Sequence, residues 1–87
     1  MKSSLNVGFI DGELKWQLKI SINQLSLRAG FGEGYLSQLL REHPVNVKLS
    51  TVDAIWTAAM VRYAEIGVEP PDDLWERLVY HDPTDSA

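Results

Sequence analysis

Apolar residues recur at the i, i+3, i+4 spacing of an α-helix along most of this 87-residue chain, and polar or turn-forming residues separate the stretches that share it. The pattern predicts helices over residues 11–18, 22–29, 33–42 and 50–66, and a short last helix over 74–79. Short connections between such helices leave little room for a sheet. We therefore expect an all-α domain of four to five short helices.

The best-marked predicted helix begins after Ser21. Ser21 and Gln24 fit a capping box, in which the side chain of each residue bonds the backbone N–H of the other. Gly30 stands where the chain needs a left-handed residue to leave the helix. A turn through Phe31 and Gly32 then leads to the helix over 33–42. The inward positions of that helix are Leu36, Leu39 and Leu40.

Single residues mark the other helix boundaries. The expected N-terminal caps are Asp11 for the first helix, Ser50 for the fourth and Asp72 or Asp73 for the last. Pro44 is expected to end the third helix, and Gly67 the fourth, because neither residue continues a helix well.

Both ends of the chain differ from its helical middle. Leu5, Val7 and Phe9 alternate with other residues, which suits a short strand or an arm over residues 1–10. Residues 81–87 have no apolar side chain to bury apart from the last alanine, so we expect a flexible polar tail. A single helical domain over 11–80 remains.

The charge of the chain is divided unevenly. Residues 1–62 carry seven basic and five acidic side chains, a balance of +2, whereas residues 63–87 carry one and seven, a balance of −6. The two sum to the formal net charge of −4. The acidity therefore belongs to the C-terminal quarter, and the middle of the chain is mildly basic.

Composition excludes several function classes. The chain has no cysteine, which removes disulfides, thiolate metal sites and cysteine nucleophiles, and a cytoplasmic protein is expected. No long apolar run suggests a signal peptide or a membrane span. His43 and His81 each stand beside one acid and lack the spacing of a metal site or a catalytic triad. We expect neither an enzyme nor a cofactor.

The segment from Ser21 to Glu42 resembles the helix-turn-helix of the lambda-repressor/Cro-like (XRE-type) family. The matching positions are the capping Ser21, the pair Leu25-Ser26, the pair Gly30-Phe31 and Leu36. Ser26 stands where the family usually has Ala, and Gly32 where it usually has Ser or Thr. The resemblance covers about residues 12–67. It implies a lambda-repressor-like fold and a small prokaryotic or phage-type transcriptional regulator that binds specific double-stranded DNA through helix 33–42.

The outward side of helix 33–42 suits the major groove. A wheel at 100° per residue places Gly34, Gln38 and Arg41 opposite the leucines, where Gln38 suits adenine and Arg41 suits guanine or a phosphate. With the resemblance added, the expected base-reading residues are Glu33, Gly34, Tyr35, Ser37, Gln38 and Arg41. The expected phosphate contacts are Lys15, Lys19, Arg28 and Lys48. The same polar side chains also fit a solvated helix face.

A single module of this size makes few DNA contacts, so a homodimer on two half-sites is expected. The stripe of Leu74, Trp75, Leu78 and Val79 fits either a dimer interface or the core of its own domain. The alternative function is a protein-interaction module, antitoxin-like or an inhibitor of a basic partner, that uses the helix-turn-helix as a scaffold and the acidic C-terminal region as a contact.

Overall fold

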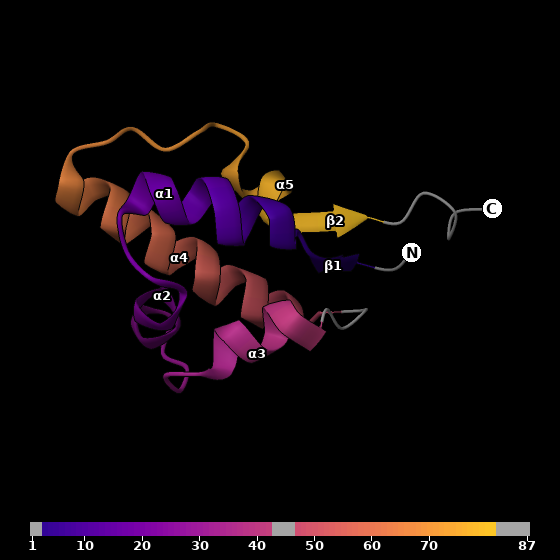
Figure 1. The fold of residues 1–87 in the computed structure, drawn as a ribbon. Coiled ribbons are helices and arrows are strands. Elements are labelled where there is room, and N and C mark those ends of the chain that lie inside the picture. Colours follow the sequence, from indigo (N-terminus) through magenta and orange to yellow (C-terminus); the bar gives the residue numbers. More distant parts are fainter. Residues whose placement is uncertain (1–2, 43–46, 82–87) are drawn as a thin grey trace.

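The structure is a computed structural model that describes residues 3–42 and 47–81. Helices make up most of these residues, and one short antiparallel pair of strands joins the two ends of the fold (Figure 1). The elements are β1 (Ser3–Leu5), η1 (Phe9–Leu14), α1 (Lys15–Leu18), α2 (Ile22–Arg28), α3 (Tyr35–Glu42), α4 (Leu49–Ile66), α5 (Leu74–Leu78) and β2 (Val79–His81). The prediction of a mostly helical domain is confirmed.

The N-terminal segment forms a strand. β1 pairs with β2 in an antiparallel register in which Leu5 lies opposite Val79. Leu5 is fully buried, so the strand belongs to the domain. His81 is part of β2, which corrects the start of the predicted tail, and residues 82–87 lie outside the described residues.

The first helix begins earlier than predicted. Oδ1 of Asn6 accepts a hydrogen bond from the Phe9 N–H at 3.2 Å, and the Asn6 carbonyl accepts one from Ile10. The helical chain then runs through the wider turn of η1 directly into α1. Asp11 therefore lies inside the helix and does not cap it. Its carboxylate pairs with Lys15 four residues on.

The predicted start and end of α2 are confirmed. The Ser21 hydroxyl accepts from the Gln24 N–H at 3.1 Å, and the Gln24 side chain accepts from the Ser21 N–H at 3.1 Å. At the other end, Gly30 has φ = 88°. The N–H groups of Gly30 and Phe31 bond the carbonyls of Leu27 and Ser26, which satisfies the last turn of α2.

Helix α4 is the longest of the described helices. It begins at Leu49, one residue before the predicted cap, so Ser50 lies in its first turn and is not its N-terminal cap. Gly67 ends it with φ = 70°, as predicted. Pro44 and His43 lie outside the described residues.

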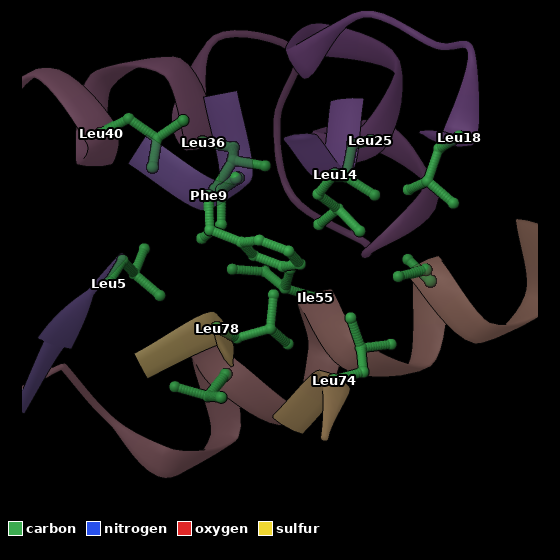
Figure 2. Close-up of a cluster of buried hydrophobic side chains, with 14 of the residues drawn as sticks. Leu5, Phe9, Leu14, Leu18, Leu25, Leu36, Leu40, Ile55, Leu74 and Leu78 are labelled. Atoms are coloured by element: carbon green, nitrogen blue, oxygen red, sulfur yellow. The ribbon is translucent and has the colours of Figure 1, made fainter. Parts of the chain in front are cut away.

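The core lies where η1, α1, α2, α3 and α5 meet α4 (Figure 2). Its fully buried side chains come from every one of these helices and from β1, and include Leu5, Ile10, Leu14, Leu18, Leu25, Leu36, Ile55, Tyr63, Leu74 and Leu78. The buried phenol of Tyr63 donates a hydrogen bond to the Gln17 side chain at 2.6 Å. Nearly every element therefore contributes at least one fully buried side chain to the core.

The burial of the last helix corrects the predicted dimer interface. Leu74 and Leu78 retain 2% and 0% of their exposure and pack on α4, so neither is available to a second copy of the folded chain. Trp75 and Val79 are half-buried beside them. The apolar stripe of α5 thus serves its own domain. Across residues 3–42 and 47–81, no helix has the length and apolar character needed to cross a bilayer.

Candidate nucleic-acid interface

Helices α2 and α3 pack against each other and are joined by the turn over residues 29–34. Ser26 of α2 ties this unit together. Its hydroxyl, fully buried, donates to the Gly32 carbonyl at 2.6 Å and accepts from the Leu36 N–H at 3.2 Å. One side chain thus holds both the turn and the first turn of α3. The two helices are thereby kept in one relative position.

The start of α3 differs from the prediction. The helix begins at Tyr35, and Glu33 and Gly34 lie exposed in the turn that precedes it. The Tyr35 N–H bonds the Gly32 carbonyl at 3.1 Å. Apart from the two chain neighbours of Gly34, no atom of residues 3–42 and 47–81 lies within 4 Å of the place where a Cβ would stand on it, and its φ is not positive. The fold itself therefore does not require a glycine at 34.

Helix α3 buries one side and exposes the other. Leu36 and Leu40 are buried against the core, as predicted, whereas Gln38 and Arg41 are exposed. The Gln38 amide donates to the Glu42 carboxylate at 2.9 Å. This bond lies in solvent, so a partner can displace it at little cost.

Tyr35 belongs to the turn more than to the outward side of α3. Its ring lies 4.9 Å from that of Phe31, at an interplanar angle of 54°. Tyr35 is 44% exposed, so the contact covers one part of the ring and leaves another part open. The aromatic pair adds a second link between the turn and α3.

Arg41 and Ser37 border a hollow between α3 and the beginnings of η1 and α2. Its volume is about 380 Å³, and Val7, Asp11 and Ile22 complete much of its wall. Two predicted base-reading residues are therefore brought next to the first turn of α2. Gln38 lies one residue from Ser37 along α3, on the exposed side.

A second hollow, of about 390 Å³, also borders the start of α2, at Ser21 and Gln24. Lys15, Lys19, Ser21 and Gln24 border it, together with Trp16, which is 79% exposed. Across the two hollows, three basic side chains (Lys15, Lys19 and Arg41) accompany one acidic side chain, Asp11. We use the name α2–α3 surface for the region formed by Lys15, Lys19, Ser37, Arg41 and the first turn of α2.

The structure separates the other two predicted phosphate residues from this surface. Arg28 forms an ion pair with Glu65 of α4 at 2.8 Å, and Arg62 joins the same carboxylate at 3.4 Å. The bond from Arg28 is the main cause that holds the pKa of Glu65 below its ordinary value, and Arg62 adds to it. Arg28 is thus committed within the protein. Lys48 is exposed directly before α4 and borders neither hollow.

The sequence alone did not reveal the role of Ser26. The one available signal was its place in the motif, where a small apolar residue is usual and where Gly32 leaves the next helix without a side-chain cap. A buried serine beside an uncapped helix start is a reason to expect a hydrogen bond between them. Ser26 makes that bond.

No protein-family model, curated protein or solved structure matches this chain. Within the described part of the chain, no three histidine, cysteine, aspartate or glutamate residues gather in a way that could hold a metal ion. The candidate site consequently depends on the geometry and charge of the α2–α3 surface alone.

Proposed function

We propose that the protein binds double-stranded DNA in a sequence-specific manner and that α3 lies in the major groove. The observation that carries this proposal is that α3 and basic side chains both adjoin the start of α2. Ser37 and Arg41 share a hollow with Ile22, and Lys15 and Lys19 share one with Ser21 and Gln24. In helix-turn-helix proteins, one helix usually contacts the base edges, and basic side chains beside it contact the phosphates.

Base reading falls to Gln38, Arg41 and Ser37, with Glu33 and Tyr35 at the start of the helix. Gln38 exchanges its bond to Glu42 for a bidentate contact to adenine, and Arg41 reaches guanine. Gly34 lets the start of α3 approach the duplex closely, since it has no side chain and no described residue beyond its chain neighbours fills the space where a Cβ would stand. The released Glu42 carboxylate stays in solvent.

Phosphate contacts fall to Lys15 and Lys19, and Lys48 remains a candidate near the start of α4. Lys15 also has an acidic neighbour, Asp11, but at 3.4 Å, which is longer than the 2.8 Å between Arg28 and Glu65. Arg28 is removed from this set because of its closer ion pair. A regulator of transcription that reads two half-sites would require two copies of the domain. The pairing of copies would use a surface other than Leu74 and Leu78.

A salt titration tests the phosphate contacts. Fluorescence anisotropy would measure binding of the protein to a labelled duplex of about 20 base pairs between about 50 and 200 mM salt. Each phosphate contact contributes about −0.9 to the slope of log K against log salt, so the variant Lys15→Gln/Lys19→Gln should make the slope less steep by about 1.8.

The matched control is Arg28→Gln/Arg77→Gln. It removes the same charge from side chains that border neither hollow of the α2–α3 surface and that pair with Glu65, Asp73 and Glu13. Its slope should equal that of the unaltered protein. Equal losses in both variants would show that only net charge matters and would contradict a built surface.

A protein-interaction module is the second candidate, and the exposed Trp16 favours it. Tryptophan is frequent at the centres of protein interfaces, and 79% of this side chain is open to solvent. Three arginines are moreover committed to carboxylates of their own chain. Absence of duplex binding at about 50 mM salt, where electrostatic binding is strongest, would favour this candidate over DNA.

A further inference from the structure

The side of α4 that faces α5 carries a third hollow, which differs in chemistry from the two described above. Trp56 and Met60 of α4 and Trp75 of α5 line it, and the loop with Pro70 and Pro71 closes one edge. Its volume is about 390 Å³. The side of α4 toward α2 carries Ala54 and Ala58, which share a hollow with Arg28. At 100° per residue, Trp56 and Met60 lie on nearly the opposite side of α4, so their hollow lies away from the α2–α3 surface.

The two tryptophans form the floor of this hollow. Their ring centroids lie 6.1 Å apart, at an interplanar angle of 71°, which is an edge-to-face arrangement. Both rings are half-buried, so each keeps part of its surface open to solvent. The negatively polarised face of an indole attracts a cation that comes within about 6 Å.

The rim of the hollow is acidic. Glu69, Asp72 and Glu76 border it, all three are exposed, and no basic side chain is among the residues that line it. Among the side chains that the structure describes, none forms an ion pair with these three carboxylates, whereas the neighbouring Asp73 is paired with Arg77. Charge and aromatic surface thus favour the same occupant, a cationic one.

We propose that this hollow, which we call the Trp56–Trp75 hollow, binds an arginine or lysine side chain from a basic segment of a partner protein. The alkyl part of such a side chain packs on the tryptophans and Met60, and its charged end meets the three carboxylates. Phosphates are repelled by the same rim. The inference does not rest on DNA binding, since it concerns another side of α4 and the opposite charge.

The test uses a peptide probe of alternating arginine and glycine, eight residues long and blocked at both ends. Nuclear magnetic resonance would follow the indole N–H signals of the three tryptophans during a titration. The signals of Trp56 and Trp75 should shift in a saturable manner, and that of Trp16 on α1 should not. A peptide with citrulline in place of arginine, similar in shape but uncharged, should produce no saturable shift.

Two variants of equal charge decide whether the rim is a site. Glu69→Gln/Asp72→Asn/Glu76→Gln and the control Asp11→Asn/Glu33→Gln/Asp53→Asn each bring the net charge from −4 to −1. All six residues are exposed, so both variants should fold, which circular dichroism would verify. The first should weaken binding of the arginine peptide about tenfold, and the control should leave it unchanged. An equal loss in both, or binding of the citrulline peptide, would overturn the proposal.

Discussion

The replacement Ser26→Ala tests how the α2–α3 unit is held. It removes a hydroxyl that is fully buried and that makes two hydrogen bonds, to the Gly32 carbonyl and from the Leu36 N–H. The two lost partners are not equivalent. Gly32 lies in an exposed turn, where water can replace the hydroxyl, whereas the bond to Leu36 is buried.

The expected loss follows from this difference. An unsatisfied buried N–H costs about 1–3 kcal/mol, and a bond that water can replace is worth about 0.5–1.5 kcal/mol. The free energy of unfolding should therefore fall by between about 1.5 and 4.5 kcal/mol, a large part of the total of about 4–13 kcal/mol expected for a chain of this length.

Urea unfolding followed by circular dichroism measures this loss. The matched control is Ser50→Ala, because Ser50 is an exposed serine in the first turn of α4 with no side-chain hydrogen bond to any described residue. The control should change the free energy of unfolding by less than about 0.5 kcal/mol. Equal effects of the two replacements would refute the role assigned to Ser26.

Three further predictions concern the core and two titrating groups. Leu78→Ala should cost about 2–5 kcal/mol at every protein concentration, because Leu78 is buried in its own domain; a cost that grew on dilution would indicate a dimer interface instead. Arg28 and Arg62 hold the pKa of Glu65 below its ordinary 4.5, so the stability that their ion pairs contribute should be fully present above pH 4.5 and lost as the pH falls through the pKa of the folded state. Glu65→Gln should therefore make the free energy of unfolding depend less on pH in acid. An unchanged dependence would contradict this. Burial, and secondarily Glu13, raises the pKa of Tyr63 above 10.0, so the free energy of unfolding should decline as the pH rises past 10. Tyr63→Phe should reduce this decline and should cost about 0.5–1.5 kcal/mol at pH 7 through the lost hydrogen bond to Gln17. A decline as steep as that of the unaltered protein would count against this.

Local signals predicted both ends of α2 well. The capping box of Ser21 and Gln24 and the left-handed Gly30 depend only on residues within a few positions of each other, and the structure has both. The left-handed Gly67 at the end of α4 is a signal of the same kind. Such features depend on neighbouring residues only, so the local sequence is enough to predict them.

Non-local contacts account for what the sequence did not show. The pairing of β1 with β2 joins residues more than seventy positions apart, and the sequence of neither segment indicates which strand it pairs with. The ion pair of Arg28 with Glu65 likewise depends on how α2 packs on α4. The apolar stripe of α5 indicates that one side of this helix is covered. Only the assembled fold shows that the core of the same domain covers Leu74 and Leu78.

Selection from a pooled library of random duplexes tests most directly whether α3 reads DNA. The unaltered protein would be compared with Gln38→Ala/Arg41→Ala and with Gly34→Gln, whose Cβ would meet no atom of the described residues within 4 Å and whose position is exposed. The account predicts that the unaltered protein enriches one common site, less strongly at higher salt, and that both variants remain folded and fail to enrich it. Enrichment of no site, or of the same site by all three proteins, would contradict the claim that α3 reads the bases.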